Sequence, residues 1–419
     1  MKTVKILWLS NMAPSAVEQQ LSGNQGSGLW MDRTLADLRQ RGYALRILCR
    51  KDRDTEGRLD SACSYRTFRG KLPQEPVPEL EPLFRQEIKS FHPDVIHIWG
   101  SEFAHCLAMV RAAEEENRLD RTVVSIQGLV TACALHYTDG LPRQVIRGYT
   151  LRDFLRQDNL RQQQEKFALR GENEQQALAL CRHVMGRTRW DREWSQRLAP
   201  KAAYHFCNET LREAFYEGQW SYEGCQKHRI FASSCLYPIK GFHYLLEAFA
   251  EIADKYPDAV LAVPGTSPLS GGLKGYLRAD GYAAYLRRLI CKNHLQNKVE
   301  FLGHLGPEEM KAQYLKANVF VLPSTIENSP NSMGEAMLLG APVTAADVGG
   351  VTTMLESGKE GLVYQGTAPY MLADCIERIF AMGENARTLG ENARAHALKT
   401  HDPAANLAAL LKIYEDIGS

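Results

Sequence analysis

The densest chemical signal in the sequence is a pair of carboxylates within residues 322–343. Glu327 and Glu335 are separated by seven residues. The pattern predicts a strand that ends at Pro323, a loop that carries Glu327, and a helix that begins near Asn331 and holds Glu335 in its first turns. The first N–H groups of a helix lack intrahelical partners and can hold a phosphate. Ionised carboxylates accept several hydrogen bonds, so the two glutamates suit the hydroxyls of a sugar or a ribose.

A simpler interpretation of the same residues is structural. Glu335 could do no more than stabilise a helix N-terminus, and Glu327 could be an ordinary loop acid. Two glutamates at this spacing are common in any chain, so the hypothesis depends on the strand, loop and helix that frame them.

A glycine-bearing loop in the first half is a further candidate. Residues 22–28 precede a predicted helix over 29–41, and Gly26 and Gly28 would let the backbone approach a ligand closely. The glycines are not spaced as Gly-x-Gly-x-x-Gly, which disfavours a hydride-transferring dinucleotide enzyme. A plain surface turn is the alternative.

Short apolar runs alternate with helical patterns along the whole chain, which is typical of parallel sheets covered by helices, an α/β fold. Right-handed crossovers bring the carboxyl ends of such strands to one edge of a sheet, where ligands bind. The expected strands are 4–9, 44–48, 94–99, 122–126, 183–185 and 203–206 in the first half, and 229–232, 259–263, 299–302 and 319–322 in the second.

Length and composition indicate two globular domains. The 419 residues exceed one ordinary core, and the aromatic-rich stretch 208–227 has no clear periodicity. We therefore expect domains at 1–210 and 211–403, with a final helix at about 404–419 that could pack back onto the first domain.

Charge and apolar patterning bear on partners and location. The formal net charge of +1 gives no general reason to bind nucleic acid. An arginine-rich stretch over 143–201 could form a basic face or a solvated helix surface. No signal-peptide pattern and no run of about 20 apolar residues occurs. These features favour a cytoplasmic protein, with peripheral contact at the inner face of the plasma membrane left open.

With its strand, loop and helix, the segment around Glu327 and Glu335 resembles the retaining GT-B glycosyltransferases of glycosyltransferase family 4. That resemblance implies two facing Rossmann-like domains with a cleft between them. It implies that Glu327 binds hydroxyls of the transferred sugar and that Glu335 binds the ribose of the nucleotide. It also implies a nucleotide-diphosphate sugar as co-substrate, with no metal and no resident cofactor.

Further matches lie in the second half. Residues 237–241 resemble the family's phosphate-binding turn, so Lys240 would neutralise the diphosphate together with a helix dipole. The family often has an arginine six residues earlier, where this chain has Ser234. Arg187 is a candidate to replace that missing cation.

The resemblance places other residues by position. Gln127 stands where the family commonly has a histidine near the transferred sugar; an amide cannot be a general base. His97, Glu102 and His136 are candidates for the acceptor side, each of which alone is more often structural. Arg187 follows another strand that ends at the same edge, which makes it a better candidate for acceptor or phosphate contact than an isolated arginine would be. The other expected donor-binding residues are Gly26, Gly28, Ser234, Gly265, His304, Leu305, Asn328, Ser329, Asn331 and Ser332.

The resemblance therefore implies a retaining hexosyltransferase-type enzyme of surface polysaccharide or glycan biosynthesis. Its acceptor would be a hydroxyl of a saccharide or a lipid-linked glycan. Asp52-Arg53-Asp54 matches the Asp-x-Asp of metal-dependent transferases, but we interpret it as a solvated loop. The alternatives are a nucleotide-sugar epimerase, a glycogen-type phosphorylase with a pyridoxal cofactor, and a sugar-binding protein that has lost turnover.

Overall fold

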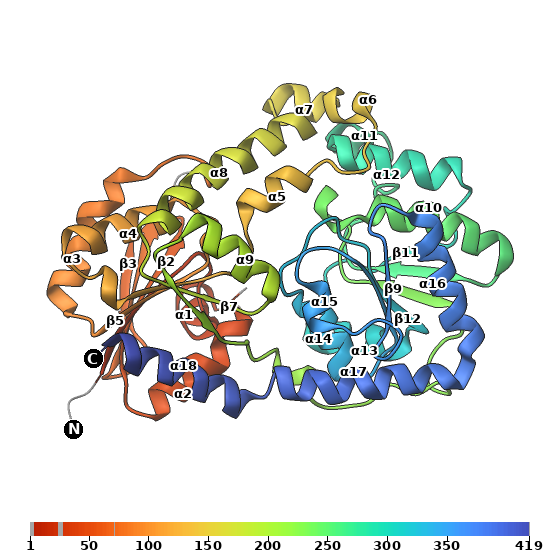
Figure 1. The fold of residues 1–419 in the computed structure, drawn as a ribbon. Coiled ribbons are helices and arrows are strands. Elements are labelled where there is room, and N and C mark those ends of the chain that lie inside the picture. Colours follow the sequence, from red (N-terminus) through yellow and green to blue (C-terminus); the bar gives the residue numbers. More distant parts are fainter. Residues whose placement is uncertain (1–3, 24–27, 71, 419) are drawn as a thin grey trace. The chain divides into compact units, whose positions relative to one another are not determined.

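The structure is a computed structural model that describes residues 4–23, 28–70 and 72–418. The chain divides into two compact units (Figure 1). The first comprises residues 1–132, 166–210 and 401–419, and the second comprises 133–165 and 211–400. The C-terminal helix α18 (Pro403–Gly418) thus belongs to the first unit. Residues 133–165 group with the second unit, whereas the sequence interpretation placed them in the first domain.

The first unit is built on one eight-stranded sheet of order β3-β4-β2-β1-β5-β6-β7-β8. Every neighbouring pair is parallel except β3 and β4, which pair antiparallel. The β3–β4 hairpin was not predicted. The strands are β1 (Lys5–Ser10), β2 (Ala44–Lys51), β3 (Thr55–Arg58), β4 (Cys63–Arg69), β5 (Val95–Trp99), β6 (Thr122–Ser125), β7 (His183–Gly186) and β8 (Ala203–Phe206).

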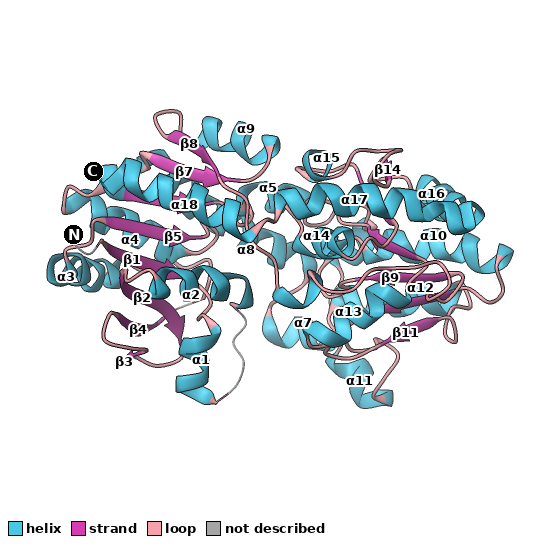
Figure 2. Cartoon of the chain, turned by 90° about the horizontal axis from the view of Figure 1, so that it is seen from below, coloured by secondary structure: helices cyan, strands magenta, loops and turns pink. Residues whose placement is uncertain are grey.

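Alternation along the buried strands supplies two cores, one on each face of this sheet. In β1, Leu7 and Leu9 pack with α3, α4 and α8, while Ile6 and Trp8 pack with α1, α2 and α18. Figure 2 shows these strands between helices. The helices are α1 (Ser15–Ser22), α2 (Asp32–Gln40), α3 (Glu81–Phe91), α4 (Ala104–Glu115), α8 (Leu160–Leu180), which begins in the second unit, and α9 (Arg189–Leu198).

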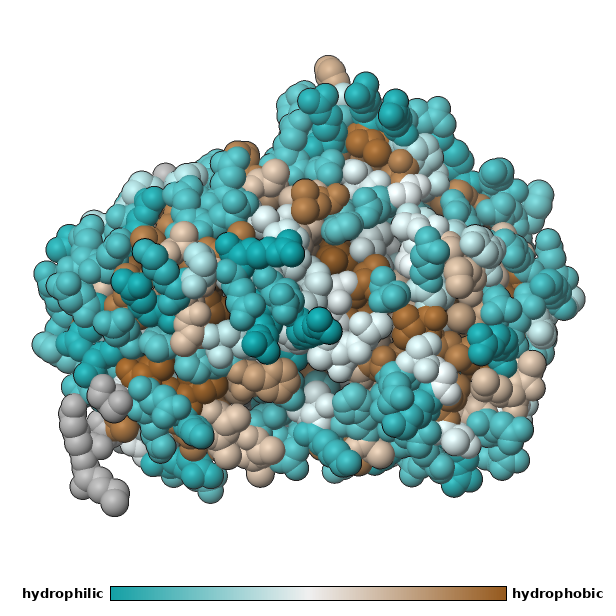
Figure 3. Space-filling model, in the orientation of Figure 1, coloured by the Kyte–Doolittle hydropathy of each residue, from teal (hydrophilic) through white to brown (hydrophobic). Residues whose placement is uncertain are grey.

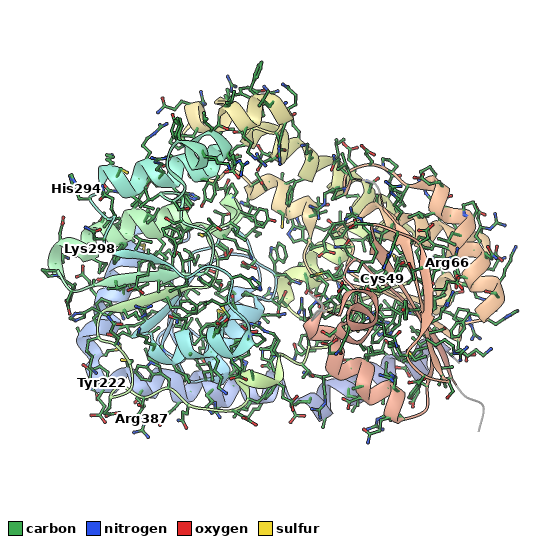
Figure 4. The ribbon with its side chains drawn as sticks, turned by 180° about the vertical axis from the view of Figure 1, so that it is seen from behind. Cys49, Arg66, Tyr222, His294, Lys298 and Arg387 are labelled. Atoms are coloured by element: carbon green, nitrogen blue, oxygen red, sulfur yellow. The ribbon has the colours of Figure 1, made fainter. Side chains whose placement is uncertain are left out.

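A charged cluster ties the outer part of this sheet to α3. The buried Glu87 carboxylate accepts hydrogen bonds from Arg46 of β2 and from Arg66 of β4, at 2.8 and 3.1 Å. Arg66 is labelled in Figure 4. The two guanidinium groups hold the pKa of Glu87 below its ordinary value although burial acts to raise it.

The second unit contains one parallel six-stranded sheet of order β11-β10-β9-β12-β13-β14. Numbered from the first strand of this unit, the order is 3-2-1-4-5-6, as in a Rossmann fold. The strands remain parallel, and the order in which they are added to the sheet reverses between β9 and β12. The strands are β9 (Arg229–Ala232), β10 (Val260–Val263), β11 (Val299–Phe301), β12 (Val319–Leu322), β13 (Val343–Ala346) and β14 (Leu362–Tyr364).

Helices cover both faces of the second sheet. α13, α14 and α17 bury one face with Phe231 and Phe320 of the strands. α10 packs against α12 and α16 on the other face. The helices are α5 (Val130–His136), which begins in the first unit, α6 (Arg143–Arg147), α7 (Leu151–Arg156), α10 (Phe242–Lys255), α11 (Gly272–Arg278), α12 (Gly281–Lys292), α13 (Pro307–Lys316), α14 (Asn331–Leu338), α15 (Val351–Met354), α16 (Pro369–Met382) and α17 (Ala386–Thr400).

Both units are therefore α/β domains with Rossmann-like parallel sheets, which confirms the predicted fold class. Across the described ranges, the structure has no helix with the length and apolar character needed to cross a bilayer.

Candidate functional site

The strand order of the second sheet reverses between β9 and β12. Open parallel sheets bind ligands at such a point, beyond the carboxyl ends of their strands. β9 ends at Ala232 and is followed by the turn that carries Lys240. β12 ends at Leu322 and is followed by the loop that carries Glu327. The topology thus brings together two residues that the sequence singled out independently.

Lys240 and Glu327 form a direct ion pair. The Lys240 ammonium donates to Glu327 Oε1 at 2.6 Å, and the Ser324 hydroxyl donates to the same oxygen at 2.8 Å. The Glu327 side chain is 12% exposed and that of Lys240 35%. Burial acts to lower the pKa of Lys240, but the Glu327 charge and hydrogen bond outweigh it and raise that pKa above its ordinary value. The site therefore holds a charged lysine.

Main-chain contacts fix both loops. Thr325 N–H donates to the Ile239 carbonyl at 2.9 Å, which joins the Glu327 loop to the Lys240 turn. Gly241 has φ of +65°, and a Cβ there would lie 1.8 Å from the carbonyl oxygen of Pro323. Only glycine fits this approach, and it lets α10 begin directly beside the end of β12.

A second glycine supports Glu327 from the loop after β13. Gly349 has φ of +54°, and a Cβ there would lie 1.9 Å from the Glu327 carbonyl oxygen. The next residue, Gly350, donates its N–H to that oxygen at 3.0 Å. The backbone that carries the carboxylate is therefore held on two sides.

The helix α14 begins at Asn331, as predicted, after Pro330 in an extended conformation. Among the described residues no side chain caps this N-terminus, which leaves N–H groups of its first turn available to an anion. Asn331, Ser332 and Ser329 are partly accessible and Asn328 is buried. The Ser329 hydroxyl lies 3.3 Å from the Met354 sulfur.

Glu335 lies in α14 with a side chain only 4% exposed. Arg212 donates to both of its oxygens, from Nε at 2.7 Å and from Nη2 at 2.8 Å. The Tyr314 hydroxyl lies 3.3 Å from Oε2. Burial raises the pKa of Glu335, and Arg212 and Tyr314 oppose that shift. The ribose role of Glu335 stays a prediction, and Arg212 is a partner that the sequence interpretation missed.

The remaining donor candidates of this unit lie on loops at the same strand ends. Gly265 and Gly303 exchange two main-chain hydrogen bonds, at 2.8 and 3.1 Å, which pair the ends of β10 and β11. His304 is exposed and Leu305 is partly exposed. Ser234 accepts a weak hydrogen bond from Leu236 N–H at 3.4 Å and supplies no positive charge.

In the first unit, Gln127 and Arg187 share one partner. The Gln127 amide donates to Glu209 Oε1, and Arg187 Nη1 donates to Glu209 Oε2 at 2.6 Å. Arg187 Nη2 also donates to the Gln127 carbonyl at 3.2 Å. Arg187 is 6% exposed, so a buried ion pair positions the Gln127 loop at the end of β6. Its proposed phosphate contact stays a prediction.

Glu102 supports the same loop from the end of β5. Its Oε1 accepts a hydrogen bond from Gly128 N–H at 3.1 Å. Burial, with a contribution from the charge of Glu174, raises the pKa of Glu102 to about 7. Glu174 itself is fully buried and accepts from Ser101, Val130 and Thr131. Glu102 is thus a perturbed carboxyl at the sheet edge, which is compatible with its predicted place on the acceptor side.

The two histidine candidates, His97 and His136, lie in different units. His136 belongs to the second unit, where its ring lies 2.7 Å from Asp139 and its carbonyl accepts from the Thr325 hydroxyl at 3.0 Å. His97 is fully buried between Tyr414 and Ser125, and burial lowers its pKa to about 3. That histidine is a neutral core residue.

Two glycine predictions fall in the loop before α2. Gly26 lies outside the described residues. Gly28 is buried, and a Cβ there would lie 2.6 Å from the Ala13 carbonyl oxygen, so close packing is the reason that this position needs glycine.

The Asp-x-Asp segment is a turn. Asp54 accepts the Arg69 N–H at 2.8 Å, and the Arg53 carbonyl accepts from the Thr67 hydroxyl. These contacts close the connection from β2 into the β3–β4 hairpin. Within residues 4–23, 28–70 and 72–418, no cluster of His, Cys, Asp or Glu has the composition of a metal site.

Comparison with known proteins gives an independent line of evidence. Residues 225–396 match the family described as glycosyl transferases group 1. A D-inositol 3-phosphate glycosyltransferase of Corynebacterium glutamicum (strain R) is 32% identical over 182 residues, which are 43% of this chain. The match spans 41% of that relative's own length.

Solved structures extend the likeness to nearly the whole chain. A sucrose-phosphate synthase from Thermosynechococcus elongatus has a TM-score of 0.70 at 18% identity and covers 98% of both chains. Anabaena HepE in complex with UDP has a TM-score of 0.66 at 18% identity and covers 98% of this chain and 99% of its own. Both Rossmann-like domains thus share the GT-B fold.

Proposed function

We infer that this chain moves a sugar from a nucleotide-diphosphate sugar to a hydroxyl of a saccharide or lipid-linked glycan acceptor. The match of residues 225–396 to the glycosyl transferases group 1 supports this proposal. The observation that carries this proposal is the Lys240–Glu327 pair, which lies where the strand order of the second sheet reverses, beside the start of α14. The cation and the helix N-terminus there match the diphosphate of such a donor, and the carboxylate matches the hydroxyls of its sugar.

The diphosphate is assigned to Lys240 and the start of α14. Departure of the sugar leaves negative charge on the diphosphate, and fixed positive charge lowers the barrier most where such charge develops. A lysine point charge and unpaired N–H groups suit that task. The chemistry as proposed requires no metal ion and no resident cofactor.

The sugar is assigned to Glu327, since a carboxylate held by Ser324 and Lys240 has lone pairs left for hydroxyls. Glu335 is proposed to face the ribose, with Arg212 fixing its orientation. The first unit is proposed to bind the acceptor, with Gln127, Glu102 and Arg187 near it.

We propose retention of anomeric configuration. The bond from the anomeric carbon to the phosphate oxygen breaks, the acceptor oxygen bonds to the same face of that carbon, and the acceptor proton passes to the departing phosphate. Gln127 cannot take that proton, and we assign it to the oxygen of the departing phosphate. We place the enzyme in the cytoplasm and in glycan or surface polysaccharide synthesis, with contact at the inner face of the plasma membrane.

A ligand screen tests the proposal. Thermal unfolding is followed with uridine, guanosine and adenosine diphosphates and with their sugars, since tight binding raises the apparent stability by mass action. We expect one base to give the largest rise, and its sugar donor to be consumed slowly without acceptor and faster with one. The anomeric configuration of the product is read by NMR. No stabilisation by any diphosphate, together with no donor consumption, would refute the proposal.

A further inference from the structure

Two neighbouring helices of the second unit expose apolar side chains that their own fold does not cover. α7 and α11 contact each other, although more than a hundred residues separate them in sequence. The α7–α11 surface consists of the apolar residues Tyr149, Leu151, Phe154, Leu155, Leu273, Tyr276 and Leu277 and the cations Arg143, Arg147, Arg156, Lys274 and Arg278. Figure 3 shows apolar and polar side chains interleaved over this part of the unit.

The apolar residues form one stripe on each helix. Leu151, Phe154 and Leu155 stand at i, i+3 and i+4 of α7 and are 51, 62 and 72% exposed. α11 repeats the spacing with a leucine, a tyrosine and a leucine from position 273, of which Leu273 is 75% exposed. Amphipathic helices normally pack such a stripe against the core of the protein. A surface made from two exposed stripes therefore indicates contact with an apolar partner outside the unit.

The charges of this surface have one sign. Residues 143–157 and 271–279 contain a single acid, Asp153, which is fully buried and bonded to Arg152. The acids just beyond are also engaged, since Asp158 pairs with Arg152 at 3.5 Å and Asp280 caps α12. The exposed cations are therefore not neutralised by neighbouring carboxylates.

We propose that the α7–α11 surface docks on the surface of an anionic phospholipid bilayer. Apolar side chains between arginines and lysines match the interfacial zone, where acyl chains and acidic headgroups lie within a few ångströms of each other. A second copy of this chain fits less well, because a self-complementary contact would place the cations against one another.

Contacts within the same unit connect the surface to the candidate site. α6 packs on α12, and the ring of His243 in α10 bonds the Asp139 carbonyl at 3.0 Å. The Thr325 hydroxyl, two residues before Glu327, donates to the His136 carbonyl. Docking through α7 and α11 would therefore hold the Glu327 loop at the membrane surface without a mobile tether.

Vesicle co-sedimentation of the full chain, without donor or acceptor, tests the proposal separately from any activity. The probes are vesicles of phosphatidylcholine alone and of phosphatidylcholine with phosphatidylglycerol. The apolar variant is Leu151→Ser, Phe154→Ser and Leu155→Ser together, and the charge variant is Arg147→Gln with Arg156→Gln. Tyr370→Ser is the matched control, because Tyr370 of α16 is 65% exposed and lies outside the surface.

We expect wild type and Tyr370→Ser to bind only the anionic vesicles, less strongly as salt is raised. The apolar variant and the charge variant should each lose at least about tenfold in vesicle affinity and keep the wild-type unfolding temperature, since the substituted side chains are exposed. Equal binding by the apolar variant and wild type, equal binding to both vesicle types, or no vesicle binding at all would overturn the proposal. Self-association in solution that the apolar variant abolishes would assign the surface to a second copy and would overturn it too.

Discussion

Arg212 holds both carboxylate oxygens of Glu335, at 2.7 and 2.8 Å, although 123 positions separate the two residues. Arg212 follows directly on the division between the units, while Glu335 lies inside α14. Three residues earlier, Glu209 binds Gln127 and Arg187 of the first unit. The connecting segment is thus anchored by one ion pair in each unit, and each pair includes a residue predicted for the site.

Replacing Arg212 with alanine should destabilise the second unit by about 2–3 kcal/mol, because the buried Glu335 carboxylate would lose its charged partner. Denaturant unfolding measures this loss. Arg378→Ala is the control, since Arg378 pairs with Asp374 on an exposed helix surface at 3.8 Å and should change stability by less than about 0.5 kcal/mol. Equal effects of the two substitutions would show that the Arg212 pair contributes no more than a surface pair.

Glu327→Ala should reduce sugar transfer at least about tenfold, which corresponds to roughly 1.4 kcal/mol of transition-state stabilisation. The carboxylate is the only part of the side chain that suits sugar hydroxyls, so Glu327→Gln should fall in the same direction. The rate is measured at saturating donor, with folding checked by circular dichroism. Glu356→Ala removes another loop carboxylate, paired with Lys359 at the surface, and should leave the rate unchanged. Near-normal transfer by folded Glu327→Ala would remove Glu327 from the site.

Lys240→Ala should weaken the binding of a nucleoside diphosphate more than that of the nucleoside, because the ammonium is proposed to contact phosphate alone. We expect at least about a tenfold loss for the diphosphate. Calorimetry of both ligands with wild type and variant gives the comparison. Lys255→Ala, which breaks an exposed pair with Glu377, serves as a control for the loss of one charge. Parallel losses for both ligands would contradict a phosphate role for Lys240.

Sequence reasoning performed best where local signals coincide. The predicted strands 203–206, 229–232 and 319–322 have the bounds of β8, β9 and β12, and the predicted helix start at Asn331 is that of α14. β9 and β12 are fully buried and are followed by Ser233 and Pro323, so burial and punctuation give the same answer there. Right-handed crossovers bring the strand ends to one edge of the sheet, so a shared location of Lys240 and Glu327 at that edge could be predicted, but their direct ion pair could not.

Other features depend on contacts that no local pattern reveals. α1, in which only Val17 is buried, and the β3–β4 hairpin, whose strands are rich in polar and charged residues, contain no apolar run and were not predicted. Residues 133–165 follow the first unit in sequence but pack with the second, through α6 on α12 and α7 on α11. The role of Arg212 could not be predicted from its neighbours in sequence, because its partner, the Glu335 carboxylate, lies 123 positions further along the chain.

Gly349→Ala should damage the Glu327 loop more than an ordinary glycine substitution would. Its φ of +54° is unfavourable for alanine, and the new Cβ would lie 1.9 Å from the Glu327 carbonyl oxygen, so the loop must move. We expect transfer to fall at least about tenfold, since small displacements of a positioned group are costly. Gly358 has φ of +81° with open space around it. Gly358→Ala should therefore cost about 1 kcal/mol of stability and no activity, and equal activity losses would contradict the positional argument.

Glu102 should make the stability of the first unit depend on pH in a direction opposite to that of an ordinary ion-paired carboxylate. Its pKa is about 7 in the folded chain, against an ordinary value of 4.5, mainly because it is buried. A raised pKa means that the folded state binds the proton more tightly, so this contribution to stability is fully present below pH 4.5 and is lost as pH rises through 7.

Glu102→Gln removes that titration while it keeps an acceptor for Gly128 N–H. Between pH 5 and pH 8, wild type should therefore lose about 1–3 kcal/mol relative to Glu102→Gln, whereas the exposed Glu193→Gln should follow wild type. Unfolding midpoints at the two pH values, read from tryptophan fluorescence, provide the comparison. If Glu102→Gln and wild type kept a constant difference across this window, Glu102 would be ionised at pH 5 in the folded chain, and its neighbours would have to stabilise the charge more strongly than its burial opposes it.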